Sequence, residues 1–410
     1  MTAICIYFQA HQPNRLKEYS FFEIGKNHFY ENDDLNLEVL NKVSEKCYLP
    51  ANEMLLRLLE RNAGKLKLTY SISGVLLEQL ENLRPDVLES FKKLVDTGHV
   101  EILCETYYHS LAYNFSKTEF EEQVEKHKAT LKRLFGVVPT SFRNTELIYN
   151  NEIASYLEGM GFKTVLAEGV DKLLGYQSPN YLYKAPNTKK IVTLVRNCKL
   201  SDDVAFRFSD RGWKEYPLTA EKFNNWIEQS GGDIANIFID YETIGEHHWS
   251  DTGIFDFWSA FLQQAVDRGF TFITPSAANE TLETKGNYDV HEFTSWADSE
   301  KDLTAWVANS MEFEAITKIY KIRDAVRSSS SKGLIHVWRK LQTSDHFYYM
   351  STKGASDGAV HNYFSPYNTP YDAYIYFMNI LSDIEVELEK ENIDVQSLLR
   401  KPENEVIMLK

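Results

Sequence analysis

The densest group of potentially reactive side chains lies between Asn236 and Trp249. A short apolar run, 237–239, is followed there by three carboxylates, two imidazoles and an indole: Asp240, Glu242, Glu246, His247, His248 and Trp249. The apolar run predicts a buried strand, and acids directly after a strand are typical of an active site at the mouth of a β/α fold. A solvated loop is the alternative, although loops rarely place aromatic and imidazole groups so densely among acids.

Polar and aromatic groups follow three earlier predicted strands in the same way. They are His11 and Gln12 after strand 3–8, the run 104–109 with Tyr108 and His109 after strand 99–103, and the run 144–149 with Glu146 after strand 140–143. His11 is either a site residue or a histidine held by a local hydrogen bond. A barrel gathers the carboxyl ends of its strands on one face, so these groups are predicted to converge.

Glu146 and Asp240 are the leading pair of carboxylates in these groups. Cleavage of a glycosidic bond passes through an oxocarbenium-like state. It needs one acid to protonate the leaving oxygen and one carboxylate to attack or to support a water. The sequence shows no nucleophilic serine or cysteine motif, so an acidic pocket rich in Trp, Tyr and His indicates a glycosidase.

Strands and helices largely alternate from residue 3 to about residue 275. The predicted strands cover residues 3–8, 65–71, 99–103, 140–143, 164–167, 191–195, 234–239 and 270–273. This alternation is typical of a parallel α/β architecture, either a barrel or a doubly wound sheet. The repeated polar groups after strands favour a barrel of about seven units.

The rest of the chain has a helical pattern, over residues 303–327, 331–350 and 368–390. We therefore predict a catalytic domain over residues 1–290 and an α-helical domain over residues 291–410. The second helical segment contains the aromatic run 341–349 with Asp345. This run either packs its aromatic rings against the barrel or contacts substrate directly.

The composition excludes some partners. The formal charge is −15, and so acidic a chain repels phosphate backbones, which argues against nucleic acid. The four cysteines are far apart and follow no metal-binding or disulfide spacing. The N-terminal run lacks a basic region and predicts the first strand, and no run reaches transmembrane length. We expect a cytoplasmic protein without a membrane partner.

The motifs, taken in order, resemble those of glycoside hydrolase family 57. The segments that carry the resemblance are 11–13 (His-Gln-Pro), 98–102 (Gly-His-Val-Glu-Ile), 142–146 (Phe-Arg-Asn-Thr-Glu) and 240–247 (Asp-Tyr-Glu-Thr-Ile-Gly-Glu-His). Segments 295–298 (Ser-Trp-Ala-Asp) and 341–350 are most similar to the compact α-amylase subgroup. The resemblance covers most of the chain. It implies an incomplete parallel (β/α)7 TIM-like barrel followed by a C-terminal α-helical domain.

The resemblance also implies a retaining double displacement on α-glucans, with Glu146 as nucleophile and Asp240 as general acid/base. No metal and no cofactor are implied. Candidate contacts to sugar hydroxyls and rings are His11, Gln12, Tyr108, His109, Arg143, His247, Trp249, Trp306 and Asp345. Glu242 and Glu246 are expected to orient neighbouring groups rather than to react.

Other functions stay open at this stage. A 4-α-glucanotransferase or a branching enzyme would use the same pair, with a sugar hydroxyl in place of water. A metal-dependent polysaccharide deacetylase would need an aspartate with two histidines, and Asp240, His247 and His248 lack the spacing that commonly presents them. A non-catalytic glucan-binding protein would lack one of the two carboxylates. Linkage preference, chain length and oligomeric state do not follow from the sequence.

Overall fold

The computed structural model describes residues 2–62 and 64–399 of the chain. The chain divides into two compact units. The first consists of Met1–His11, Glu38–Glu105 and Lys126–Ser295, and the second of Gln12–Leu37, Thr106–Glu125 and Trp296–Lys410. The domains 1–290 and 291–410 stay a prediction, and residues 400–410 of the latter lie outside the described part of the chain.

The first unit holds two sheets, with strand orders β3-β2-β1-β8 and β4-β5-β7-β6-β9. The strands are β1 (Ala3–Ala10), β2 (Leu68–Ile72), β3 (Val100–Ile102), β4 (Ser141–Arg143), β5 (Thr164–Ala167), β6 (Leu182–Lys184), β7 (Val192–Val195), β8 (Ile234–Asp240) and β9 (Thr284–Asn287). The pairings are parallel except for the antiparallel pair β6–β7. The predicted α/β fold with parallel sheets is therefore confirmed.

The first seven predicted strands correspond to β1–β5, β7 and β8. The eighth, 270–273, is wrong as a strand, because only Phe272 pairs, through an isolated parallel bridge to Ile4. The chain turns there at once into helix α12 (Pro275–Thr281), which leaves no room for a longer ladder. The short strands β6 and β9 were not predicted.

Backbone hydrogen bonds also connect the two sheets. Cys104, just after β3, forms a parallel bridge to Phe142 of β4. The Cys104 N–H donates to the Ser141 carbonyl at 3.0 Å, and the Arg143 N–H donates to the Cys104 carbonyl at 2.9 Å. After β7, the Asn197 N–H donates to the Asn236 carbonyl of β8 at 2.8 Å. β3 is thus linked to β4, and β7 to β8.

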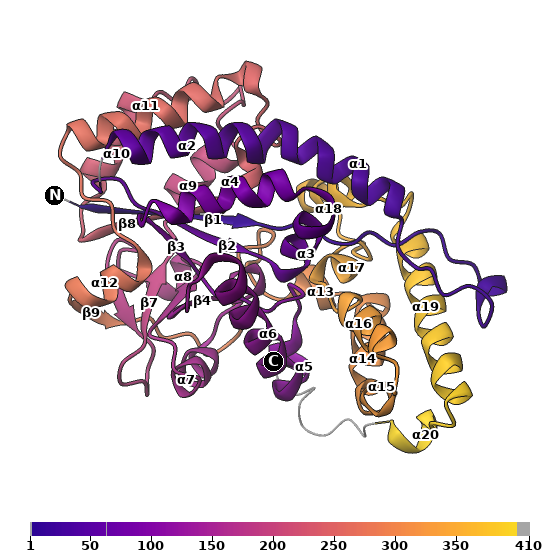
Figure 1. The fold of residues 1–410 in the computed structure, drawn as a ribbon. Helices are drawn as coiled ribbons and strands as arrows, with labels where there is room; N and C mark the ends of the chain where they lie inside the picture. The colour runs from indigo at the N-terminus through magenta and orange to yellow at the C-terminus, as the bar shows by residue number, and fades with distance from the viewer. Residues whose placement is uncertain (1, 63, 400–410) are drawn as a thin grey trace. The chain divides into compact units, whose positions relative to one another are not determined.

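Apart from short 3-10 turns, twelve helices of the described residues lie wholly in the first unit or cross its boundary with the second. They are α1 (Asp33–Val43), the π-helix η2 (Ser44–Tyr48), α2 (Leu49–Arg61), α3 (Gly74–Leu83), α4 (Pro85–Asp96), α6 (Lys117–Phe135), α7 (Asn151–Gly159), α8 (Asp171–Leu174), α9 (Cys198–Ala205), α10 (Ala220–Ser230) and α11 (Ile254–Asp267), with α12 as given above. The helices α10, α11, α2 and α4 form a row in which each contacts the next, and they lie over β1 in Figure 1.

Strand β1 separates an apolar side from a polar one. Ile4, Ile6 and Phe8 belong to the hydrophobic core that also contains Leu55 and Leu59 of α2. Since successive side chains of a strand point to opposite faces, the alternate residues of β1 face away from these helices. This alternation leaves polar side chains on the inner side of the sheet, where the site described below is built.

The second unit is helical. Its helices are α5 (Ala112–Phe115), α13 (Thr304–Val307), α14 (Ser310–Lys321), α15 (Arg323–Ser328), α16 (Lys332–Lys340), α17 (Ser344–Tyr348), α18 (Ala355–Phe364), α19 (Pro370–Lys390) and α20 (Val395–Leu398). The prediction over 368–390 is confirmed by α19. The predicted helix 303–327 is three helices, because Asn309 and Glu312 form a capping box that starts α14 anew.

Candidate active site

Asp240 is the last residue of β8, as the sequence predicted. Backbone pairing places it beside Gln9 of β1, which in turn lies beside Ser71 of β2. The Asp240 residue is half-buried. Because the three strands are parallel, these polar residues form one level near the carboxyl ends of the strands.

Glu146 follows β4 in a single turn of 3-10 helix, η3 (Thr145–Leu147). Its φ is 57° and that of Leu147 is 52°, in the left-handed region that residues with a side chain seldom adopt. Such backbone strain costs on the order of 1–3 kcal/mol and recurs where a side chain must be held in one direction. The turn is closed by the Leu147 N–H, which donates to the Asn144 carbonyl at 3.0 Å.

The two carboxylates lie at the same end of the parallel strands β4 and β8. β4 is linked to β3 by the Cys104–Phe142 bridge, and β3 is joined through β2 and β1 to β8. All of these pairings are parallel. Glu146 therefore follows the carboxyl end of β4, and Asp240 lies at the carboxyl end of β8, both in the first unit.

A buried polar layer of Tyr7, Gln9, Ser71 and Glu105 lies at the level of Asp240. The Tyr7 hydroxyl donates to Gln9 Oε1 at 2.6 Å, and Gln9 Nε2 donates to Glu105 Oε1 at 3.0 Å. The Ser71 hydroxyl also donates to Glu105. Burial raises the pKa of Tyr7 well above its ordinary value, which the Arg143 charge opposes and Glu105 and Asp240 reinforce. The charge of Asp240, the predicted acid/base, thus acts on Tyr7 in this layer.

Arg143 and Glu105 add opposite charges to this inner side. Arg143 is the last residue of β4 and, like Glu105, is fully buried. His127 supports Glu105 from α6: its Nδ1 accepts the Glu105 N–H at 3.1 Å, and its Nε2 lies 2.9 Å from the Ile72 carbonyl. Burial lowers the pKa of His127, which keeps the ring neutral and able to accept that hydrogen bond.

The loop after Asp240 is anchored by its acidic side chains. Glu242 is only 5% exposed and accepts hydrogen bonds from the Tyr48 hydroxyl and, at 3.4 Å, from the His11 N–H. Burial and then the Asp240 charge raise the pKa of Glu242 to about 8. Glu246 pairs with Lys42 Nζ at 2.5 Å. Both glutamates contact neighbouring groups, and the expectation that they orient these groups rather than react stays a prediction.

The His11 ring is held locally as well. Its Nδ1 lies 2.7 Å from the Ser73 hydroxyl, which caps α3 after β2. His11 and Ser73 follow the neighbouring strands β1 and β2, so this contact fixes the ring at their carboxyl ends. The local hydrogen bond foreseen for His11 is present, and it leaves the ring in the region of the predicted site.

The two consecutive histidines of the loop have different surroundings. His248 uses both ring nitrogens: Nδ1 lies 2.7 Å from the Ser209 hydroxyl, and Nε2 lies 3.0 Å from the Val204 carbonyl. Burial lowers the pKa of His247 to about 4, and the charges of His248 and Lys42 act in the same direction. His248 is therefore not available as the second histidine that a metal site with Asp240 and His247 would need.

Trp249 is the most exposed of the predicted site residues, with 57% of its surface open. Lys46 Nζ lies 4.4 Å from the centroid of its ring. A cation over an aromatic face is attracted to the π-electrons, so Lys46 steadies the indole. An exposed and steadied indole is suited to stack on a sugar ring.

Charged residues also follow β5 and β7, and the sequence did not single them out. Arg196 donates from Nε to the Phe238 carbonyl of β8 at 2.8 Å and from Nη2 to Asp202 at 2.6 Å. The buried Glu168 lies 3.4 Å from Arg196 Nη1. Cys198 Sγ is 2.7 Å from Glu168 Oε1. The hydrogen bond from Arg196 to Phe238 thus connects the carboxyl end of β7 to β8, two residues before Asp240.

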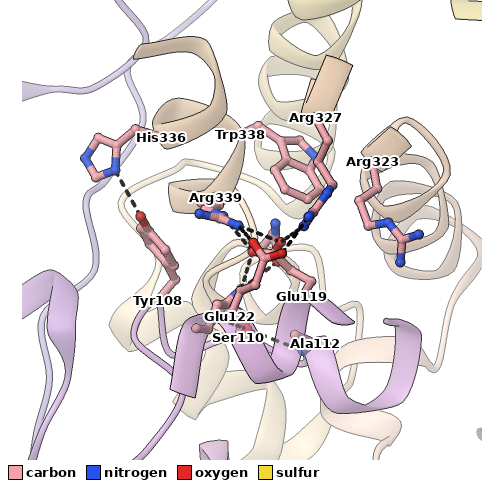
Figure 2. A network of polar contacts seen from close by, with 12 residues as sticks. Tyr108, Ser110, Ala112, Glu119, Glu122, Arg323, Arg327, His336, Trp338 and Arg339 are labelled. Atoms are coloured by element: carbon pink, nitrogen blue, oxygen red, sulfur yellow. Dashed lines mark hydrogen bonds and ion pairs between the residues drawn. The ribbon is translucent and has the colours of Figure 1, made fainter. Parts of the chain in front are cut away.

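Five predicted site residues belong to the second unit: Gln12, Tyr108, His109, Trp306 and Asp345. Tyr108 and Trp306 are each only 1% exposed. The Tyr108 hydroxyl lies 3.0 Å from His336 Nδ1. Figure 2 marks this contact with a dashed line. Gln12 Oε1 accepts a hydrogen bond from Arg15 at 3.0 Å. The buried rings pack within their unit, and their role toward a substrate stays a prediction.

His109 and Asp345 lie close to the start of α17. The His109 carbonyl accepts the Ser344 N–H at 2.9 Å, and His109 has a φ of 52°. Asp345 stands in the first turn of α17 and is followed by the buried His346 and Phe347. The structure thus brings these two predicted residues into the same part of the second unit.

Within the described residues, one group of side chains is suited to hold a metal ion: His28, Asp383 and Glu387 of the second unit. Asp383 already accepts hydrogen bonds from the Tyr30 hydroxyl and the Gly25 N–H, both at 2.5 Å, and its Oδ2 lies 2.7 Å from His28 Nδ1. These bonds account for the buried carboxylate without an ion.

Sequence comparison places the chain among known enzymes. The model of glycosyl hydrolase family 57 matches residues 5–291. The protein "Putative alpha-amylase" of Methanocaldococcus jannaschii is 44% identical over 404 residues, which cover 94% of this chain and 85% of that protein. The α-amylase of Pyrococcus horikoshii is 25% identical over 234 residues, 56% of this chain and 35% of that protein.

Solved structures share the fold at low sequence identity. The family 57-type branching enzyme of Pyrococcus horikoshii has a TM-score of 0.68 at 15% identity, covering 98% of this chain and 97% of that one. The 4-α-glucanotransferase of Thermococcus litoralis has a TM-score of 0.63 at 16% identity, covering 92% and 60%. In the described part of the chain, no helix is long and apolar enough to cross a membrane. A family match over most of the chain and a relative 44% identical over nearly all of it lead to one conclusion: this chain belongs to glycosyl hydrolase family 57.

Proposed function

We propose that this enzyme hydrolyses α-1,4-glucosidic bonds of α-glucans with retention of configuration, in the manner of an α-amylase. The observation that carries the proposal is the pair Glu146 and Asp240: Glu146 follows the carboxyl end of β4, and Asp240 is the last residue of the parallel strand β8. The 44% identical relative bears the name "Putative alpha-amylase", which favours this substrate class.

In the proposed reaction, Glu146 attacks the anomeric carbon while Asp240 protonates the leaving glycosidic oxygen. The bond to the leaving sugar breaks and a glycosyl ester forms on Glu146. Asp240, now ionised, takes a proton from water, and the resulting hydroxide oxygen displaces Glu146 from the anomeric carbon. Two inversions give net retention. The strained η3 turn supports this role, because a nucleophile must be held in line with the bond it attacks.

The scaffold we propose is the incomplete (β/α)7 barrel. Seven parallel strands are joined in the order β8-β1-β2-β3-β4-β5-β7, and a hydrogen bond from Asn197 to Asn236 links the last to the first. In such a barrel, the buried polar layer would form the floor beneath the two carboxylates. The α-helical region after residue 290 would complete the enzyme.

The substrate contacts are proposed in two sets. In the first unit, His11, Arg143 and His247 would bind sugar hydroxyls, and the exposed Trp249 would stack on a sugar ring. In the second unit the proposed contacts are Gln12, Tyr108, His109, Trp306 and Asp345. A sugar has apolar ring faces and hydroxyl groups at its edge. The aromatic rings in these sets suit the faces, and the polar side chains suit the hydroxyl groups.

The second candidate is transfer of the glycosyl group to another sugar, because two structural relatives are a 4-α-glucanotransferase and a branching enzyme. The chemistry differs only in whether water or a sugar hydroxyl reaches the intermediate. Incubation with one purified maltooligosaccharide decides between them: a hydrolase gives only shorter products, whereas a transferase gives longer ones as well.

The catalytic pair is tested by Glu146→Gln and Asp240→Asn. Each is expected to lower kcat on amylose by about 1,000-fold or more, because each removes a group that reacts. The exposed Glu283 supplies the matched control, Glu283→Gln, which should keep full activity. Circular dichroism and thermal unfolding check that the folds are equal. Wild-type turnover in either active-site variant would refute the assignment.

A further inference from the structure

Glu242 is a buried carboxyl that the proposed mechanism does not use. It lies two residues beyond Asp240, in the 3-10 turn η4 (Tyr241–Thr243), and only 5% of its surface is exposed. Its Oε1 accepts hydrogen bonds from the Tyr48 hydroxyl and the His11 N–H. One carboxyl group thereby connects the loop after β8, the residue after β1 and helix η2.

Helix η2 holds the same loop at further points. Cys47 Sγ lies 3.2 Å from the Tyr241 carbonyl oxygen, and Lys46 Nζ lies over the Trp249 ring. Gly245 packs so closely on η2 that a Cβ there would overlap the Lys46 carbonyl oxygen. π-Helical turns are rare and are often found at functional sites. Here the turn serves as the surface on which the loop that carries Asp240 is docked.

We propose that Glu242 is a positioning residue that acts in its protonated form, fixing the loop behind Asp240 through Tyr48 and His11 without placing a second negative charge beside it. The inference rests on the proposed role of Asp240 as acid/base. An ionised Glu242 would bury a second anion near Asp240, whereas a neutral carboxyl keeps the acceptor oxygen and adds a donor.

The electrostatics agree with this geometry. The groups that face Glu242 are Asp240 at the end of β8, the backbone of His11 after β1, and Cys47 and Tyr48 on η2. Among them, the charge that acts on Glu242 is that of Asp240, which opposes ionisation of the Glu242 carboxyl. Burial and the Asp240 charge raise the pKa of Glu242 to about 8, so the carboxyl holds its proton at neutral pH.

The test compares Glu242→Gln with Glu242→Ala. Glutamine keeps the acceptor oxygen, adds a donor and cannot ionise, so kcat near neutral pH is expected to stay close to the wild-type value. Alanine removes both anchors, and kcat is expected to fall about 100-fold through misplacement of Asp240. The wild-type enzyme should also lose activity as pH rises through about 8, a step that the Gln variant lacks.

A second measurement needs no substrate. Because the pKa of Glu242 is raised in the folded state, the unfolded chain loses this proton near pH 4.5 and the folded one near pH 8. The free energy of unfolding of the wild type should therefore fall relative to Glu242→Gln as pH rises from about 5 to 8. Glu312→Gln is the matched control, because burial raises the pKa of Glu312 to about 7. The free energy of unfolding of the wild type should likewise fall relative to Glu312→Gln as pH rises toward 7, whereas kcat of this variant should stay unchanged.

Two results would overturn the inference. Equal loss of kcat in the Gln and Ala variants would mean that the ionised carboxylate is required. Wild-type kcat in Glu242→Ala would mean that Glu242 positions nothing. Both differ from a failure of the proposed function, which would appear as a wild-type enzyme inactive on α-glucans while the pH dependence of stability at Glu242 is still observed.

Discussion

At the scale of single residues, the surroundings of His247 in the predicted site change its pKa. Burial, and then the neighbouring charges of His248 and Lys42, lower the pKa of His247 to about 4. The imidazole is thus neutral at the pH of most assays and able to accept a hydrogen bond from a sugar hydroxyl. A neutral ring also adds no charge to a loop that already carries Asp240.

This shift makes a prediction for acid stability. The pKa is lowered on folding, so between about pH 6.5 and 4 the unfolded chain binds a proton that the folded one does not. The free energy of unfolding should fall by about 2 kcal/mol over that range, less than the full shift implies because His247 is partly exposed. Urea unfolding at several pH values should show this loss in the wild type and not in His247→Gln. Parallel curves for the two proteins would contradict it.

At the scale of elements, the contact between the loop after β8 and helix η2 depends on a glycine. Gly245 has a φ of 107° and lies against the Lys46 carbonyl and the Phe255 ring. Both the backbone conformation and the space require the absence of a Cβ. The position of the loop is therefore set by backbone packing as much as by its side chains.

Gly245→Ala should lower kcat about 100-fold by moving the loop that carries Asp240. Gly253 gives the matched control, because its φ is 81° but nothing lies within 4 Å of an added Cβ. Gly253→Ala is expected to cost about 1–2 kcal/mol of stability through backbone strain alone and to keep kcat. Steady-state kinetics and thermal unfolding of both variants separate the two effects. Equal kcat values would show that the docking of the loop is not needed.

The helices of the second unit are joined by a buried charge network (Figure 2). Glu119 of α6 is fully buried and accepts hydrogen bonds from Arg339 Nε at 2.8 Å and Nη2 at 3.1 Å. Arg327 lies 3.8 Å from the same carboxylate, and both arginines also pair with Glu122. The network connects α6 to α15 and α16.

Arg339→Met should cost about 3 kcal/mol or more, because it leaves the buried Glu119 carboxylate without its main partner. Adding Glu119→Gln removes that uncompensated charge, so the double variant should recover part of the loss. Chemical denaturation of the two single variants and the double variant completes the cycle. Strictly additive losses would mean that the pair is not coupled.

The elements that the sequence predicted well have strong local signals. The predicted strands 3–8 and 164–167 are largely apolar and correspond to β1 and β5, and β8 contains the apolar run 237–239. Helix η2 and strands β6 and β9 lack such signals. A π-turn has no distinct sequence pattern, and β6 (Leu-Tyr-Lys) and β9 (Thr-Lys-Gly-Asn) contain too few apolar residues to form a strand pattern.

The same difference applies to the site. The positions of Asp240 and Glu146 at strand ends were predictable, because acids at strand ends form a pattern within a few residues; their catalytic roles stay a prediction. Glu105, Gln9 and Tyr48 were not singled out, since each is a single polar residue with a side-chain hydrogen-bond partner 34 to 194 positions away. Such contacts appear only when the strands are aligned.

At the scale of the whole molecule, the net charge determines how solubility depends on pH. The chain carries a formal charge of −15 at pH 7 and a pI of about 5.3. Like charges keep molecules apart, so solubility should be lowest near pH 5.3 and rise toward neutral pH. Light scattering across pH 4 to 8 at low ionic strength would show this minimum. A minimum displaced well above pH 6 would contradict the charge balance of the folded chain.

The four cysteines have one practical consequence. Cys5, Cys47 and Cys104 are buried, whereas Cys198 is partly exposed, three residues beyond β7 and beside Glu168. A thiol-reactive fluorophore should therefore label the native enzyme at one position, close to the carboxyl ends of the strands. The protein thus carries a natural attachment point for an optical reporter of glucan binding, without any cysteine having to be engineered.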